Sequence, residues 1–219
     1  MTPVISVVGR SNAGKTTLLE QLIRELTARG RRIGTVKHHF HGPVEVDVPG
    51  KDSWRHRRAG AVAVALASPN TVFVVRDMAE TEPLEAIVHR ALGGVDLVLT
   101  EGFKSEPMPK IEVNRAAQEV PLLCGPDDHL VAVVTDRPLE APVPRFGLND
   151  VAALADFIER EFLQGTTASR VEVLVGSRRL ALDPEVQEIL ARVVRSLVGD
   201  PTNLRGGSLI EIRIPGSPA

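Results

Sequence analysis

The sequence predicts an α/β protein built on a doubly wound, mostly parallel sheet. The first reason is the order of strand, glycine-rich loop and helix at the start of the chain. The second is that apolar, strand-like runs alternate with helical segments as far as residue 163. Such alternation gives a parallel sheet that binds ligands beyond the carboxyl ends of its strands. The third is a change of pattern after residue 169, which predicts a small C-terminal ββαβ unit.

The N-terminal segment carries the most specific local pattern. Residues 3–8 form an apolar, β-branched run, which predicts a buried parallel strand. Residues 9–16 (GRSNAGKT) fit G-x-x-x-x-G-K-[ST], the phosphate-binding loop (P-loop) of nucleotide triphosphatases (NTPases). Apolar residues at helical spacing follow, and Gly30 ends the predicted helix. A ligand-free glycine turn is the alternative, but the flanking strand and helix favour a nucleotide site.

The P-loop pattern assigns contacts to individual residues. Glycines allow backbone N–H groups to turn towards phosphate oxygens, and the helix N-terminus adds the positive end of its dipole. Lys15 is expected to reach the β- and γ-phosphates, and the Thr16 hydroxyl is expected to bind Mg²⁺. The residues predicted to contact the nucleotide here are Gly9, Asn12, Ala13, Gly14, Lys15, Thr16 and Thr17.

The remaining elements of this half follow from apolar periodicity and from turn residues. In chain order they are a strand over 32–36, a polar loop over 39–51, adjacent strands over 61–66 and 71–75, a helix that opens at Thr81 and Pro83 and stops at Gly93, strands over 96–100 and 130–134, and a helix over 149–163.

Two carboxylates flank the strand over 96–100. Glu101 follows its carboxyl end, where ligands collect, so Glu101 is the candidate for holding Mg²⁺ or orienting water, and with Lys15 it forms the predicted catalytic pair. An exposed turn carboxylate is the alternative for Glu101. Asp96, at the opposite end, is expected to cap or neutralise that edge.

The segment after the second strand is dense in ionisable groups. Lys37 is expected at the nucleotide, and Asp47 and Lys51 of the polar loop are expected near Mg²⁺ and the γ-phosphate, as in a switch. The histidines at positions 38, 39 and 41 suggest a metal, but their spacing fits no common zinc pattern. Arginines at 55, 57 and 58 form either a solvated helix face or a surface for a phosphorylated or acidic partner.

The identity of the base stays open at the level of residues. Guanine-specific proteins often carry Asn-Lys-x-Asp, and this pattern is absent. Asp136, after the strand over 130–134, is placed to accept hydrogen bonds from guanine, and a simple turn aspartate is the alternative. The residues alone therefore do not separate GTP from ATP.

Composition narrows the class of protein. A net charge of −2 and a lack of tyrosine argue against a nucleic-acid partner. No apolar run reaches the length of a membrane span, and the first strand begins within three residues of Met1, so no leader peptide is expected. The single cysteine, Cys124, fits a reducing compartment, so a cytoplasmic location is expected.

Three segments make up the predicted organisation. Residues 1–163 form the P-loop nucleotide-binding domain, 164–169 form a polar linker, and 170–219 form the small α+β extension. In the extension, alternating valines predict a hairpin across Gly176 and Ser177, followed by a helix and a last strand. About fifty residues are too few to be stable alone, so we expect the extension to dock onto a partner or to dimerise.

Several longer blocks resemble the MobB family of molybdopterin-guanine dinucleotide biosynthesis adaptors. They are the P-loop at 9–16, Lys37-His38, the segment 47–56 (DVPGKDSWRH), Glu101-Gly102-Phe103-Lys104 and residues 109–113 (PKIEV). The similarity spans residues 1–163 and leaves the extension without a counterpart.

The resemblance implies a homodimeric, cytoplasmic protein that binds GTP and Mg²⁺ and has weak GTPase activity. Such a protein assists a molybdenum cofactor guanylyltransferase, which joins GMP to the molybdopterin cofactor. Gly14, Lys15 and Thr16 carry over as phosphate and Mg²⁺ contacts, with Glu101 as their acidic partner. Two alternatives remain: an ATP-dependent ligase or kinase acting on a small acidic substrate, and a metal-insertion GTPase that uses the histidines.

Overall fold

The chain divides into two compact units. The computed structural model describes residues 2–39, 42, 44, 46–78, 81–118, 120–164, 173–175, 178–180, 182–183, 185–186, 189–190, 192–193, 196 and 212–214. One unit comprises Met1–His38 with Glu85–Ala219, and the other comprises His39–Leu84. The P-loop belongs to the first unit, so this unit contains the predicted centre of the site.

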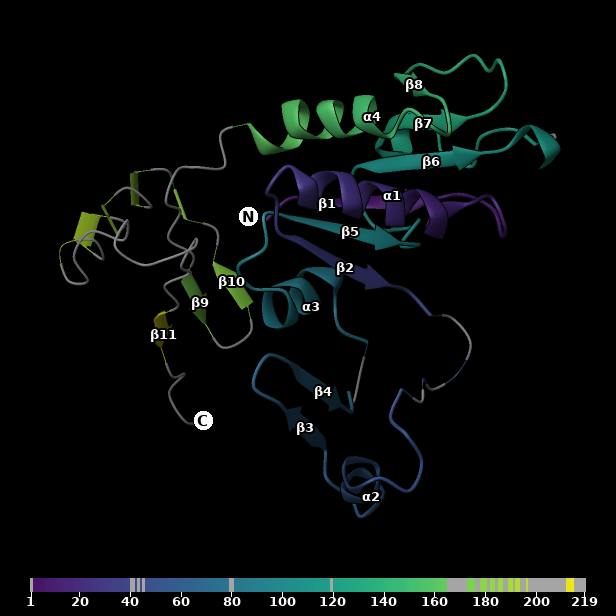
Figure 1. Cartoon of the computed structure of the whole chain (residues 1–219). Helices are drawn as coiled ribbons and strands as arrows, with labels where there is room; N and C mark the ends of the chain where they lie inside the picture. Colours follow the sequence, from purple (N-terminus) through teal and green to yellow (C-terminus); the bar gives the residue numbers. More distant parts are fainter. Residues whose placement is uncertain are drawn as a thin grey trace. The chain divides into compact units, whose positions relative to one another are not determined.

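The first unit is built on a six-stranded sheet in the order β2-β5-β1-β6-β7-β8 (Figure 1). All its neighbouring strands pair in parallel. The strands are β1 (Val4–Val8), β2 (Ile33–Lys37), β5 (Leu97–Glu101), β6 (Lys110–Asn114), β7 (Leu130–Thr135) and β8 (Arg145–Phe146). The predicted α/β fold with a mostly parallel sheet is therefore confirmed.

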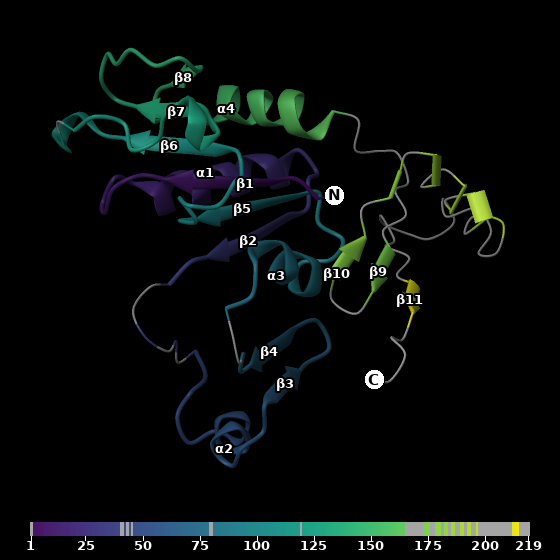
Figure 2. The ribbon, with the colours of Figure 1, turned by 180° about the vertical axis from the view of Figure 1, so that it is seen from behind.

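Helices cover this sheet. They are α1 (Lys15–Ala28), α3 (Leu84–Ala91) and α4 (Val151–Ile158), which continues as a π-helix over Glu159–Leu163; two short 3₁₀ turns are η1 (Ala116–Gln118) and η2 (Pro126–Asp128). Figure 1 shows α1 in front of β1, and the reverse view in Figure 2 shows β1 in front of α1. Leu22 and Leu26 of α1 and Leu154 of α4 share one buried core with β1, β5, β6 and β7. Burial of this apolar face holds α1, and with it the P-loop, on the sheet.

Strand β6 corrects the sequence analysis, which predicted no strand between 100 and 130. It lies between β1 and β7 and is buried along its whole length. Its polar residues Lys110, Glu112 and Asn114 are at most 2% exposed. Lys110 Nζ donates to the carbonyl oxygens of Glu106 (2.7 Å), Met108 (3.2 Å) and Asp128 (2.7 Å). The Glu112 carboxylate accepts from the backbone N–H groups of Leu123 and Cys124. Because these partners satisfy the two buried charges, Lys110 and Glu112, a strand with polar alternation occupies the centre of the sheet.

The second unit contains α2 (Asp52–Arg58) and an antiparallel hairpin of β3 (Ala63–Ala67) and β4 (Val72–Arg76). The hairpin turns at Ser68, whose hydroxyl accepts from the N–H of Thr71, so the predicted pair of adjacent strands is confirmed. Arg57 of α2 forms an ion pair with Asp77 at 2.6 Å. The described residues between 39 and 51 contain no helix or strand, as the predicted loop requires.

The C-terminal segment is described in part. Strand β9 (Val173–Val175) pairs antiparallel with β10 (Arg178–Leu180) and parallel with β11 (Ile212–Ile214). Residues 185, 186, 189, 190, 192, 193 and 196 are helical, as the predicted ββαβ order requires. The predicted turn at Gly176-Ser177 and linker residues 165–169 lie outside the described residues. Among the helices that the structure describes, none has the length and apolarity needed to cross a membrane.

Candidate nucleotide-binding site

The P-loop connects β1 to α1 through backbone conformations that glycine adopts readily. Gly9 has a φ of +147° and Gly14, the N-cap of α1, has a φ of +95°. A Cβ on Gly9 would lie 2.5 Å from the carbonyl oxygen of Val113 on β6, far inside contact distance. Asn12 takes the left-handed region at a φ of +61°, which asparagine tolerates better than most residues. The loop is therefore pressed against β6, and its first glycine has no room for a side chain.

Lys15, Thr16 and Thr17 supply the polar side chains at the start of α1, where the loop ends. Lys15 Nζ donates to the carbonyl oxygen of Arg10 at 2.8 Å, so the ammonium group is drawn across the loop. Ala13 is buried, and its N–H also donates to the Arg10 carbonyl, at 3.2 Å. Thr16 and Thr17 stand exposed in the first turn of α1. This arrangement leaves a lysine, two hydroxyls and a helix N-terminus at one end of β1, which suits a polyphosphate.

Glu101 lies beside the P-loop, at the carboxyl end of the neighbouring strand β5. Its Oε2 accepts a 3.0 Å hydrogen bond from Thr16 Oγ1, and its Oε1 lies 3.5 Å from Lys37 Nζ of β2. The Glu101 side chain is 17% exposed and that of Lys37 is 66% exposed. The structure therefore brings together Thr16, Lys37 and Glu101, which come from three separate elements.

The Thr16–Glu101 pair has the donor chemistry and spacing that suit Mg²⁺. This ion prefers oxygen ligands in an octahedron at 2.0–2.1 Å, so two adjacent ligands lie about 3 Å apart. The 3.0 Å separation between Thr16 Oγ1 and Glu101 Oε2 agrees with that distance. An ion at this position would replace the present hydrogen bond as the link between the two oxygens.

The turn after Glu101 fixes the end of β5. Gly102 has a φ of +99° and donates to the Val7 carbonyl at 3.2 Å, while the His38 N–H donates to the Glu101 carbonyl at 3.0 Å. A Cβ on Gly102 would lie 3.2 Å from the Cβ of His38. The His38 and Phe103 rings stack with centroids 4.7 Å apart. These contacts hold the Glu101 backbone between β1 and β2, so its carboxylate starts from a defined position.

Asp136, the predicted base contact, is engaged with a neighbouring segment. Its Oδ2 accepts from Arg115 Nε at 2.9 Å, and its Oδ1 accepts from the Ala116 N–H at 2.6 Å. The hydrogen bond from Ala116 and the Arg115 guanidinium lower the pKa of Asp136. Asp136 therefore lies at the carboxyl end of β7 as a charged acceptor that fixes Arg115.

Two other carboxylates of the sequence analysis, Asp96 and Asp47, have partners of their own. Asp96 precedes β5 and pairs with Arg32 at 2.8 Å, which lowers the pKa of the Asp96 carboxyl, as expected for neutralisation at the opposite edge. Asp47 belongs to the second unit, where its Oδ1 accepts from the Val48 N–H at 2.8 Å and from Ser53 Oγ at 3.1 Å. A metal role for Asp47 stays a prediction.

Residues after β6 were missed by the sequence analysis. The guanidinium of Arg115 comes within 3.8 Å of the position that a Cβ on Gly14 would take. Gln118 Nε2 donates to the Ser11 carbonyl of the P-loop at 2.9 Å. The available signal was the polar sequence that follows residues 109–113, but it has meaning only once β6 is placed beside β1.

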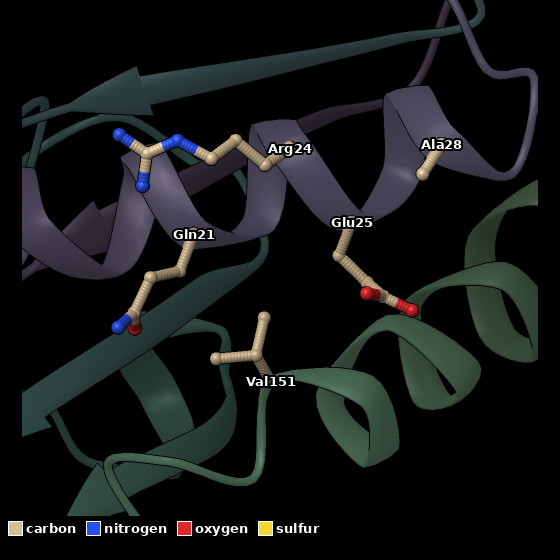
Figure 3. A pocket seen from close by; sticks show the side chains of 5 residues that line it. All are labelled: Gln21, Arg24, Glu25, Ala28 and Val151. Atoms are coloured by element: carbon tan, nitrogen blue, oxygen red, sulfur yellow. The ribbon is translucent and has the colours of Figure 1, made fainter.

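The structure also has a hollow that lies apart from the P-loop. A shallow, open hollow of about 430 Å³ is lined by Gln21, Arg24, Glu25, Ala28 and Val151, between α1 and α4 (Figure 3). None of the predicted site residues lines it. Across the residues with a described placement, no three His, Cys, Asp or Glu side chains gather as a metal site. Phe40 and His41 of the histidine segment fall outside that range.

Comparisons with known proteins point to one family. The family model for molybdopterin guanine dinucleotide synthesis protein B matches residues 4–136. A molybdopterin-guanine dinucleotide biosynthesis adapter protein of Haemophilus influenzae is 41% identical over 160 residues, which cover 72% of this chain and 88% of the relative. The Escherichia coli (strain K12) protein of the same description is 40% identical over 162 residues, 72% of this chain and 92% of its own length.

Solved structures give the same answer at the level of the fold. The X-ray crystal structure of a MobB protein homolog from Bacillus stearothermophilus superposes with a TM-score of 0.52 at 28% identity, and the match covers 72% of this chain and 96% of the homolog. The family match spans more than half of the chain, and both curated relatives exceed 30% identity over most of their length. The chain therefore belongs to the MobB family of molybdopterin-guanine dinucleotide biosynthesis adapter proteins.

Proposed function

We propose that this protein binds GTP with Mg²⁺ at the P-loop and acts as an adapter for the enzyme that attaches GMP to molybdopterin. The observation that carries the proposal is the meeting of Thr16, Lys37 and Glu101 beside the loop. The relatives named above are adapters in molybdopterin-guanine dinucleotide biosynthesis, which supports the pathway. A guanine product makes GTP the natural nucleotide for such a pathway, although Asp136 is engaged by Arg115.

The residues divide the work at the proposed site. Backbone N–H groups from Gly9 to Thr17 and the Lys15 ammonium hold the phosphates. Thr16 and Glu101 hold the metal, which neutralises developing charge on the β- and γ-phosphates when bound. Glu101 also orients water, while Lys37 adds positive charge 3.5 Å from that carboxylate. We expect weak hydrolysis, with Glu101 as the carboxylate that meets the P-loop at Thr16.

A homodimer is part of the proposal. The hairpin of the second unit exposes apolar side chains: Leu66 is 57% exposed, Val72 64% and Val74 58%. Val72 and Val74 share one face of the hairpin, and Leu66, which pairs with Phe73, lies on the other. A two-stranded hairpin is marginal by itself, and apolar groups exposed on both of its faces favour an interface. We propose that a second copy of the chain covers this apolar surface. Sedimentation analysis tests this by comparing the oligomeric state of the wild type, expected to be a dimer, with that of Val74→Lys, expected to be a monomer. A monomeric wild type at micromolar concentration contradicts this part.

The main test combines binding with reconstitution. Calorimetry with Mg²⁺ should show GTP binding to the wild type and a loss of at least about tenfold in Lys15→Ala, because one charged hydrogen bond to phosphate is removed. Arg24→Ala, an exposed change at an arginine paired with Glu20, is the matched control. Purified guanylyltransferase should make more molybdopterin guanine dinucleotide when the wild type is added. Preference for ATP, or no stimulation of the transferase, contradicts the proposal and favours an independent enzyme.

A further inference from the structure

Arg115 lies against the P-loop on the side away from Glu101. Strand β6 neighbours β1, and its Val113 carbonyl packs against Gly9. Arg115 is the next residue after β6, and its Nη1 lies 3.8 Å from the position that a Cβ on Gly14 would take. A guanidinium group is thus present at the N-terminal end of α1, where the phosphate contacts begin.

Contacts on both sides hold Arg115 in place without a ligand. The two oxygens of Asp136 accept from Arg115 Nε and from the Ala116 N–H, so they fix both the side chain and the backbone. Gln118, at the end of the same 3₁₀ turn, donates to the Ser11 carbonyl of the loop at 2.9 Å. A side chain ordered in advance loses less entropy when it meets a ligand.

The strand order sets the direction of a bound nucleotide. Thr16, Glu101 and Lys37 gather on the β5 and β2 side of the loop, which suits the metal and the terminal phosphates. The nucleoside then extends to the other side, over the carboxyl ends of β6 and β7. Residues 114–118 and 135–137 at those ends include no aromatic side chain but two arginines, Arg115 and Arg137. Arg137 donates to the Val120 carbonyl and its Nε is buried, whereas the Arg115 side chain is 38% exposed, so the guanidinium of Arg115 is the planar group available for stacking.

We infer that Arg115 binds the nucleoside part of the nucleotide by packing its guanidinium plane on the purine, and that Asp136 is the positioning residue for Arg115. The inference rests on the proposed nucleotide function and refines it. It moves Asp136 from direct contact with the base to an action through Arg115. The charged plane of arginine attracts an aromatic ring, and lysine offers no such plane.

The test compares GTP with inorganic tripolyphosphate, which has the same phosphates and no nucleoside. Both ligands are titrated with Mg²⁺ into wild type, Arg115→Ala, Arg115→Lys and Asp136→Asn. Arg115→Ala should weaken GTP binding by about threefold to thirtyfold and leave tripolyphosphate binding unchanged. Arg115→Lys should behave like Arg115→Ala, and Asp136→Asn should show a smaller loss for GTP alone. The control Arg24→Ala removes another exposed arginine paired with a carboxylate and should change neither affinity.

The outcomes separate this inference from the proposed function. Unchanged tripolyphosphate binding shows that a variant keeps a folded P-loop. If Arg115→Ala does not fold, the comparison of GTP with tripolyphosphate is made with Arg115→Lys instead. Equal losses for both ligands make Arg115 a phosphate contact and overturn the inference, as do unchanged affinities for both. A wild type that binds tripolyphosphate as tightly as GTP also overturns it, while the P-loop assignment stands. A wild type that binds neither ligand overturns the nucleotide function and the inference together.

Discussion

Replacing Gly9 by alanine should damage the P-loop far more than the same change at Gly30. The new Cβ at position 9 would lie 2.5 Å from the Val113 carbonyl oxygen. The backbone of residue 9 fixes the Cβ and the oxygen belongs to the backbone, so no side-chain rotation relieves the clash. Strain from the φ of +147° adds about 1–3 kcal/mol and overpacking adds about 1–3 kcal/mol, which gives about 2–6 kcal/mol in all. Gly30 has a φ of +84°, and nothing lies within 4 Å of the position that a Cβ would take there, so Gly30→Ala should lose only about 1–2 kcal/mol.

Urea denaturation followed by circular dichroism measures the two free energies of unfolding, and GTP titration measures the state of the site. Gly9→Ala should lose stability and at least tenfold in GTP affinity, because the loop must move off β6. Gly30→Ala, at the far end of α1, should keep wild-type affinity. Equal stability and equal affinity in the two variants would refute the steric argument.

Three further predictions concern single side chains. Glu101→Gln should slow GTP hydrolysis at least tenfold with less than threefold change in GTP affinity, and equal rates would reduce Glu101 to a structural carboxylate. Lys110→Met leaves three carbonyl oxygens without their donor and should lose about 2–5 kcal/mol of unfolding free energy, whereas exposed Lys104→Met should lose less than about 0.5. Hydrogen bonds from Arg31 and, next, Arg29 lower the pKa of Glu159 in the folded protein. The stabilisation that Glu159 contributes to the fold is therefore complete above its ordinary pKa of 4.5, and it disappears as the pH falls through the lower pKa of the folded state. Glu159→Gln should therefore be less stable than wild type at pH 7 by about 1–2 kcal/mol, with the difference shrinking in acid unfolding curves; a difference independent of pH would contradict the assignment.

The strand-loop-helix unit at the N-terminus was predictable because its signals are local. The apolar run, the fixed glycine spacing and the helical periodicity all lie within the first thirty residues, where the structure has β1 and α1. Glu101 was also within reach, since the end of a buried strand is visible in the sequence. Its meeting with Thr16 and Lys37 follows once β1, β5 and β2 are neighbours.

Strand β6 was missed because its stabilising partners are distant in sequence. Lys110 and Glu112 give it the polar alternation of a surface segment, and the groups that satisfy them lie in loops up to eighteen residues away. Without β6, neither the contact of Arg115 with the loop nor the engagement of Asp136 was visible. Because this central strand was not predicted, the residues that contact the P-loop from the β6 side, Arg115 and Gln118, were not assigned to the candidate site.

The buried charges of β6 also fix its alignment with its neighbours. A slip by one residue would turn Lys110 and Glu112 into the apolar layer beside α1 and leave their carbonyl and amide partners empty. Such a mispaired sheet would be much less stable, so the charged side chains of Lys110 and Glu112 fix the register of β6. Neither residue contacts the proposed nucleotide, yet the register that they fix places Arg115 next to Gly14. A neutral, evenly apolar β6 would not fix this register.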